Sequence, residues 1–356
     1  MTLGVDTHAD VHVGVALDAL GRRLGACTIP TTPAGYAQLV AWAGQFGTGE
    51  PVGIEGAGGY GAGLARWLHA RHIPIREVER PNRQTRRRRG KSDPVDAEAA
   101  ARAVQAGTTV GQPKTGDGPV EMIRALQVAR RSAMRARTQA ANQLHALVVT
   151  APDALRARLR RLSLAQQVAT AAAFRVSAGP TTPTEATKLA LRSVARRYRQ
   201  LRLEIEVLDA QVASLVAQAA PGLLAVKGVG TDTAATLLAA AGDNPERLRS
   251  EPAFAHLCGV APVPASSGKT NRHRLNRGGN RDANRALHLL AVRRLAWDPR
   301  TRADVARRTA EGKTMPELLR CLKRYLVREL YPVLMTVRGP SAGIGPHAAP
   351  APPPPS

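Results

Sequence analysis

The sequence of 356 residues predicts an α/β domain at its N-terminus followed by a mainly helical remainder. Two patterns support this fold class. Over residues 1–80, short strand-like runs alternate with segments of helical spacing, which is the element order of an α/β domain. Beyond residue 119, apolar residues recur at intervals of three and four, which is typical of helices. Hydrophobic residues make up 44% of the chain, enough for real cores.

The first eighty residues carry the strand and helix patterns in order. Apolar residues alternate with others from Val11 to Leu17, and a turn sequence at 18–21 leads to a second strand over 23–29. Helical spacing follows over 32–46. Next we expect a strand at 51–55, a Gly-rich turn at 56–61 and a helix at 63–71. A further strand at 73–78 and a helix at 92–105 follow. This order predicts an α/β domain over residues 1–118.

The clearest periodic signal lies in the middle of the chain. Its apolar residues are spaced alternately by three and four: Leu191, Val194, Tyr198, Leu201, Ile205, Leu208, Val212 and Leu215. This is an a/d pattern over more than three heptads, so it predicts a coiled-coil seam. The seam would pack on the Ala-rich helix predicted over 120–149 or on another chain. Residues 151–184 give no clear pattern, and the whole region 119–220 is interpreted as helical.

The C-terminal part predicts a small helical domain over residues 221–338. Pro221 ends the long helix, and residues 223–242 read as a short helix, a turn at Gly228-Val229-Gly230 and a second helix. Residues 339–356 are rich in Gly, Pro and Ala and predict a disordered tail.

The net charge of the chain limits the classes of function that it can have. The chain has 51 Lys and Arg against 27 Asp and Glu, a formal net charge of +24. This excludes an acidic solvating protein and a typical neutral cytosolic metabolic enzyme, and it favours a polyanionic partner. Arg dominates, and Ala, Gly and Pro are abundant, so a GC-rich coding bias explains part of the excess. The placement of the basic residues therefore carries more weight than their number.

Two basic runs stand out as candidate nucleic-acid contacts. The first holds Arg80, Arg83, Arg86, Arg87, Arg88, Arg89 and Lys91, and the second holds Lys269, Arg272, Arg274, Arg277, Arg281 and Arg285. Aromatic residues are only 3% of the chain, which argues against base stacking and favours phosphate contacts through Arg.

Several sequence features indicate where in the cell the protein is found. No stretch approaches the ~20 apolar residues needed to span a bilayer, and the N-terminus is unlike a signal peptide. Cys27, Cys258 and Cys321 show neither disulfide nor zinc spacing. We therefore expect a cytoplasmic protein with no membrane partner.

Four carboxylates form a candidate metal site. Asp6 and Glu55 each end a strand-like run, and Asp93 and Asp96 begin a helix. Strand ends and a nearby helix turn meet at one edge of a sheet. Carboxylate oxygens suit Mg²⁺, and two such ions can clamp a phosphodiester. An alternative explains the residues without metal: Asp93 is an N-cap before Pro94, Asp96 occupies N3, Glu55 is a surface residue, and Asp6 accepts backbone hydrogen bonds.

Two Gly-containing loops in the C-terminal part suit phosphate handling. Backbone N–H groups around Gly228 and Gly230 can face a phosphate, although an ordinary helix connection explains the glycines equally well. The loop Ser266-Ser267-Gly268-Lys269 opens the second basic run. Basic residues there would neutralise a phosphate, and the alternative is a solvated loop with two turn serines.

These motifs resemble those of DEDD-type transposases of insertion sequence family one-hundred-ten. The N-terminal motifs are Gly4-Val5-Asp6-Thr7-His8, Ile54-Glu55-Gly56-Ala57-Gly58-Gly59-Tyr60-Gly61 and Lys91-Ser92-Asp93-Pro94-Val95-Asp96-Ala97. The C-terminal motifs are Gly259-Val260-Ala261-Pro262, Ser267-Gly268 and Arg277-Gly278-Gly279-Asn280. Leu224–Gly230 resembles a helix-hairpin-helix. The resemblance covers roughly Leu3–Arg338.

The resemblance implies a RuvC-like (RNase H fold) N-terminal domain in which Asp6, Glu55, Asp93 and Asp96 bind Mg²⁺. It implies that Ser267, rather than Ser266, is a nucleophile that forms a covalent phosphoserine link to DNA. It further implies a composite site within a homo-oligomer of two to four subunits, double-stranded donor and target DNA as substrates, and a structured bridge RNA as guide.

The sequence is therefore interpreted as a transposase or site-specific DNA recombinase. Three alternatives remain open. The first is a RuvC-like nuclease or junction resolvase that uses metal-activated water and forms no covalent intermediate. The second is a non-catalytic nucleic-acid-binding protein with a degenerate acid site. The third, a DNA invertase, is a close variant of the transposase.

Overall fold

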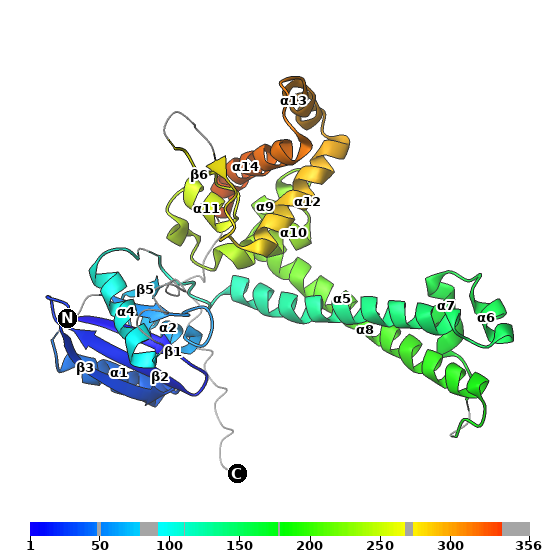
Figure 1. Cartoon of the computed structure of the whole chain (residues 1–356), viewed down its shortest axis with the longest axis horizontal. Helices are drawn as coiled ribbons and strands as arrows, with labels where there is room; N and C mark the ends of the chain where they lie inside the picture. Colours follow the sequence, from blue (N-terminus) through cyan, green and yellow to red (C-terminus); the bar gives the residue numbers. More distant parts are fainter. Residues whose placement is uncertain (48–50, 79–91, 110, 177–178, 268–272, 337–356) are drawn as a thin grey trace, which may run out of the picture. The chain divides into compact units, whose positions relative to one another are not determined.

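The structure is a computed structural model that describes residues 1–47, 51–78, 92–109, 111–176, 179–267 and 273–336 (Figure 1). The chain divides into two compact units. One comprises Met122–Thr236, and the other comprises Met1–Glu121 together with the chain from Leu237 onward. The domain boundaries expected from the sequence, at 118, 220 and 338, stay predictions. The expected disordered tail, 339–356, lies outside the described residues.

The N-terminal part is built on a five-stranded mixed sheet in the order β3-β2-β1-β4-β5. The strands are β1 (Thr2–Thr7), β2 (Val11–Leu17), β3 (Arg23–Pro30), β4 (Val52–Glu55) and β5 (Ile75–Val78). Strands β1, β2 and β3 pair antiparallel, whereas β4 is parallel to both β1 and β5. The α/β prediction for this part is confirmed, and such a sheet fits a RuvC-like domain.

Helices cover both faces of the sheet (Figure 1). On one face, α1 (Pro33–Gly44) and α2 (Ala62–His69) bury Leu39, Leu64 and Leu68 against β1 and β4. On the other, α4 (Asp93–Gln105) packs small alanines against apolar residues of β2. Every residue of β1 is buried because the strand is central and covered on both faces. Such a strand reads as a continuous run rather than as an alternating pattern.

The unit Met122–Thr236 is helical. Its helices are α5 (Pro119–Val149, which starts in the other unit), α6 (Asp153–Leu159), α7 (Leu164–Ala172), α8 (Pro183–Ala219), α9 (Pro221–Ala225) and the start of α10 (Thr231–Ala241). Two of these, α6 and α7, lie in the region 151–184, for which no clear pattern was found. Ser163 caps α7 with a capping box to Gln166, a signal that the sequence interpretation missed.

The expected heptad stripe lies on one continuous helix. All eight of its residues, which belong to α8, are buried or half-buried. At one end the stripe packs on α5, where Leu191 of α8 shares a core with Leu144 and Val148. Further along, Arg130 of α5 pairs with Asp209 of α8. The stripe therefore meets a helix of its own chain, while supercoiling of the two helices stays a prediction.

The C-terminal part is mostly helical. Its elements after α10 are the 3₁₀ helix η1 (Pro245–Leu248), α11 (Glu251–Leu257), β6 (Val263–Pro264), β7 (His273–Arg274), α12 (Arg281–Trp297), α13 (Pro299–Ala310) and α14 (Met315–Leu334). Helix α14 packs against α11, α12 and α13 and buries Leu318, Leu322, Leu326 and Leu330. Among the described helices, none is long and apolar enough to cross a membrane.

Candidate active site

Asp6 and Glu55 are brought together by strand pairing. Strand β1 runs parallel to β4 with Val5 opposite Ile54, so the next residue of each strand, Asp6 and Glu55, lies at the same edge of the sheet. Both are buried, with 6% and 4% of their surface exposed. The Thr7 hydroxyl donates a hydrogen bond of 2.8 Å to the Glu55 carbonyl, which ties the two strand ends together.

Helix α4 lies directly on the backbones of these two strands. A Cβ atom at Gly4 would come within 2.2 Å of the Ala97 carbonyl oxygen, and one at Gly53 within 2.8 Å of the Ala100 carbonyl oxygen. Gly4 and Gly53 are paired neighbours on β1 and β4. Only glycine allows an approach this close, so these positions fix the distance of α4 from the sheet and with it the position of the helix's first turn.

The first turn of α4 carries Asp93 and Asp96, and Asp96 is buried. The interpretation of Asp93 as an N-cap is wrong. The helix begins at Asp93 itself, and the extended residue Ser92 is the N-cap. About half of the Asp93 side chain is exposed.

A histidine that the sequence interpretation did not include lies between the acids. Nε2 of His8 is 3.1 Å from a carboxylate oxygen of Asp6 and 3.3 Å from one of Asp93. One possible ligand atom from each of these three residues lies within 4.8 Å of the others. The sequence offered one sign of this role, because His8 stands two residues after Asp6 in the same motif. The proximity of His8 to Asp93, however, depends on where α4 lies in the folded protein.

The electrostatics of the cluster favour a cation. The pKa of Asp6 is raised mainly by burial; His8 lowers it, and the nearby Asp96 and Asp93 carboxylates raise it further. A bound divalent ion would reverse this effect, because its charge stabilises the ionised carboxylates. Carboxylate oxygens are the ligands that Mg²⁺ takes, usually with few carboxylates and with substrate phosphates completing the shell. The residues present therefore fit a hard divalent ion.

A cavity of about 440 Å³ opens beside the two strand-borne acids. It is lined by Asp6, Thr7, Glu55, Gly56, Gly59 and Tyr60. Gly56 has a φ of +75°, a conformation that glycine adopts without strain, so the chain can turn sharply after Glu55. Tyr60, on this turn, is 64% exposed. The Gly-rich turn thus leaves open space next to the carboxylates.

Ser267 lies in the C-terminal part on a short hairpin. Strand β6 pairs antiparallel with β7, and Ser266 and Ser267 follow β6 as exposed residues. The base of the hairpin is tightly anchored, since a Cβ atom at Gly279 would come within 2.2 Å of the Gly259 nitrogen. This close backbone contact explains why glycine occupies positions 259 and 279, one in each of two C-terminal motifs.

The other predicted nucleic-acid contacts divide into two groups. Arg274 on β7 and Arg277 in the following turn are exposed. Gly228 has a φ of +87° in the connection between α9 and α10, and a Cβ atom added at Gly230 would meet nothing within 4 Å. The remaining predicted contacts lie outside the described residues: Arg86, Arg87, Arg88, Arg89, Lys91, Lys269 and Arg272.

Comparison with known proteins covers both parts of the chain. Residues 3–151 match a DEDD-type family of the IS110 group described as "Transposase", and residues 220–306 match the "Transposase IS116/IS110/IS902 family". A protein of Streptomyces coelicolor, named "Insertion element IS110 uncharacterized 43.6 kDa protein", is 34% identical over 148 residues. That match spans 40% of this chain and 36% of the relative, so it covers about a third of the relative's length.

The two family matches follow one another in the chain and coincide with the two sets of candidate residues. The first contains the four acids, and the second contains Ser267 with its glycine-anchored hairpin. The sheet order and the acid cluster agree with both matches, and the chain is similar to IS110-family transposases over residues 3–151 and 220–306.

Proposed function

We propose that this protein is a transposase that cuts and rejoins DNA strands with a metal-binding acid cluster and a serine nucleophile. The observation that carries the proposal is the convergence of Asp6 and Glu55 with the first turn of α4 at one sheet edge, beside an open cavity. A cluster of buried carboxylates is costly without a cation. Its presence next to a cavity favours a site for charge-neutralising chemistry on a phosphate.

Asp6, Glu55, Asp93 and Asp96 would hold Mg²⁺, with His8 beside them. When bound, the ion supplies positive charge that stabilises a phosphodiester during displacement. The chain's own residues set the geometry: the paired glycines of β1 and β4 fix α4, and the hydrogen bond from Thr7 fixes the end of β4.

Ser267 would supply the nucleophile. Its Oγ forms a bond to phosphorus, its proton is lost, and a sugar oxygen leaves and takes up a proton. The DNA strand is then held on the protein as a phosphoserine until a sugar hydroxyl reverses the step. Serine is a weak nucleophile at its ordinary pKa, so proton removal or polarisation of the phosphate must assist it.

The proposed partners follow from the resemblance to IS110-family transposases. The substrates are double-stranded donor and target DNA, a structured guide RNA selects them, and a homo-oligomer of two to four subunits brings the acids of one subunit to the serine of another. The basic composition of the chain supports two polyanionic partners. A DNA invertase would use the same chemistry on differently arranged ends.

The test is a covalent trap. The full chain is incubated with Mg²⁺, radiolabelled DNA that contains the ends of its element, and the RNA encoded beside it, and the products are separated under denaturing conditions. We expect labelled DNA to migrate with the protein, and the adduct to be lost in Ser267→Ala but kept in Ser266→Ala. Cleavage and joining that persist in Ser267→Ala would instead favour a resolvase-type nuclease that uses water.

A further inference from the structure

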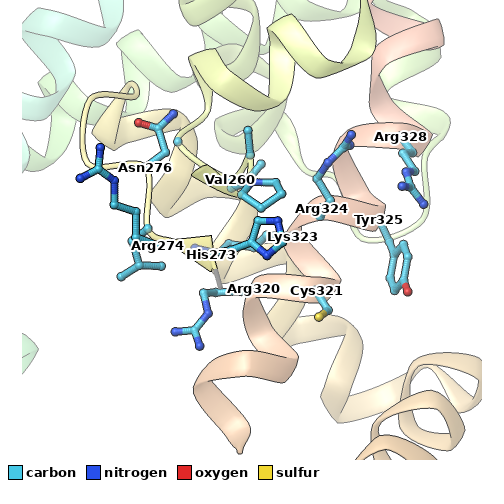
Figure 2. Close-up of a pocket in the computed structure, with 14 residues that line it drawn as sticks. Val260, His273, Arg274, Asn276, Arg320, Cys321, Lys323, Arg324, Tyr325 and Arg328 are labelled. Atoms are coloured by element: carbon cyan, nitrogen blue, oxygen red, sulfur yellow. The ribbon is translucent and has the colours of Figure 1, made fainter. Parts of the chain in front are cut away.

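A second cavity, of about 500 Å³, lies between the base of the β6–β7 hairpin and α14 (Figure 2). Apolar side chains of the chain around the hairpin form one wall, among them Val260, Pro262 and Leu275. Helix α14 forms the other wall. The volume is in the range of sites that bind a small ligand or one unit of a polymer.

The walls of this pocket carry an excess of positive charge. Its basic lining residues are Arg274, Arg320, Lys323, Arg324 and Arg328, and its lining includes no Asp or Glu. Arg324 is neutralised by Glu251 of α11, to which it makes two hydrogen bonds. Within the part of the chain that the structure describes, no carboxylate pairs with the other four.

The basic residues of α14 share one face of the helix. Arg320, Lys323, Arg324 and Arg328 follow one another at intervals of one to four, and Figure 2 shows Arg320 on the side of the hairpin and Arg328 beside Tyr325. The leucines of the same helix are buried on another face. Core packing therefore does not account for the basic face.

Lys323 is held in the pocket by a neutral partner. Its Nζ donates a hydrogen bond of 3.0 Å to Oδ1 of Asn284. The Asn284 amide donates to the carbonyls of Cys258 and Gly259 at 2.9 and 3.1 Å, which turns its oxygen toward the lysine. Burial, and then the charge of Arg320, lower the pKa of Lys323. An anion in the pocket would provide the charge compensation that the amide does not.

We propose that this pocket binds a phosphodiester group of the DNA strand that reaches Ser267, with Arg320 and Lys323 as its phosphate contacts. The inference rests on the proposed function, in which Ser267 attacks DNA. Pro262, His273 and Arg274 line the pocket and also belong to the hairpin or adjoin it. A phosphate bound here is therefore fixed relative to the chain that carries the nucleophile, and the contact positions the strand for attack.

Binding by the full chain tests the proposal without requiring catalysis. Fluorescence anisotropy is measured with a labelled single-stranded DNA, its duplex, and an RNA of the same sequence, at several salt concentrations. We expect Arg320→Gln and Lys323→Gln each to weaken DNA binding about five- to tenfold and to reduce the salt slope by about 1, as the loss of one phosphate contact predicts. Arg293→Gln removes an equal charge from an exposed position of α12 outside the pocket and is the matched control.

Cys321 lines the pocket and reports whether DNA occupies it. Bound DNA should slow the modification of Cys321 by N-ethylmaleimide, followed by mass spectrometry of its peptide, and Arg320→Gln should reduce this protection. Cys258 is buried, and its pKa is raised to about 12, so it serves as an unreactive internal reference.

Three results would overturn the assignment. The first is DNA affinity in Arg320→Gln and Lys323→Gln equal to that of Arg293→Gln. The second is unprotected Cys321 in the DNA complex. The third is weakened binding of RNA alone, which would make the pocket an RNA site. Lys323→Arg should retain binding, which separates the loss of charge from a folding defect.

The pocket and the proposed mechanism fail in different ways. If Ser267→Ala still joins DNA strands while Arg320→Gln weakens DNA binding, the nucleophile is wrong and the pocket stands. If Ser267→Ala loses the covalent adduct but Arg320→Gln binds DNA like Arg293→Gln, the mechanism stands and the pocket is wrong.

Discussion

The acid cluster and the serine hairpin are held by the fold in different ways. Asp6, Glu55 and Asp96 are each at most 6% exposed and stand on central strands and on a helix pressed against them. Ser267 is exposed and follows a strand of two residues. Carboxylates that repel one another stay together only on a rigid support, whereas a nucleophile must be reached by a phosphate. The contrast suggests that metal binding is preorganised and that substrate binding positions the serine.

The largest effect should come from the acids. Asp6→Asn and Asp96→Asn each remove a charge that the proposed ion requires. Altering a residue that only contacts a metal ligand costs up to about 100-fold in activity, so we expect the loss of a proposed ligand to lower recombination by more than that. Asp10→Asn is the control, because Asp10 is exposed and near in sequence but outside the cluster. A plasmid recombination assay measures the three variants, and equal activity in Asp6→Asn and Asp10→Asn would contradict the comparison.

A smaller effect is expected from the support of the cluster. In Gly4→Ala the new Cβ would meet backbone atoms of α4 at 2.2 Å, so the helix must shift, at a cost of about 1–3 kcal/mol. Gly44→Ala, at the end of α1, meets nothing within 4 Å and should change stability by less than about 0.5 kcal/mol. Urea unfolding measures both. If Gly4→Ala and Gly44→Ala have the same free energy of unfolding, the close contact of α4 with β1 does not stabilise the arrangement of the acids.

The smallest effect concerns metal binding to the isolated protein. Mg²⁺ at ten times its Kd should stabilise the folded state by about 1.4 kcal/mol, which corresponds to a rise of a few degrees in Tm. Asp6→Asn should abolish the rise, and Ser267→Ala should keep it. Loss of the rise in Ser267→Ala would mean that the two regions do not act separately.

Without metal, the same carboxyl sets a pH dependence. Because the pKa of Asp6 is raised above its usual value of 3.8, the folded state holds this proton more tightly than the unfolded state. The contribution of Asp6 to stability therefore falls as pH rises from 3.8 through the raised pKa, and does not recover above it. Melting curves of the metal-free protein should show a shallower fall in Asp6→Asn. An unchanged slope would mean that Asp6 does not titrate in this way.

Much of the N-terminal fold could be predicted, because it depends on local patterns. Alternation located β2, and the apolar run before Glu55 located β4. The convergence of Asp6 and Glu55 at one edge followed from their places at the ends of strand-like runs. Helices α6 and α7 were not predicted because each is short, although the capping box of Ser163 and Gln166 marks the start of α7.

The parts of the site that could not be predicted depend on contacts between distant residues. His8 lies near Asp93 only because α4 rests on β1. Likewise, the neutralisation of Arg324 by Glu251 and the contact of Lys323 with Asn284 join residues 73 and 39 positions apart. The sequence predicts a helical domain here, but it does not reveal which cations of α14 contact a carboxylate.

The backbone contact at Gly4 and Gly53 also bears on how the sequence can change over time. Since α4 is located by the strands beneath it, the position of Asp96 does not depend on the chain that leads from β5 into the helix. Insertions or deletions between Val78 and Ser92 should therefore leave Asp6, Glu55 and Asp96 in the same arrangement. Relatives in this family should vary most in length there and least at the two glycines.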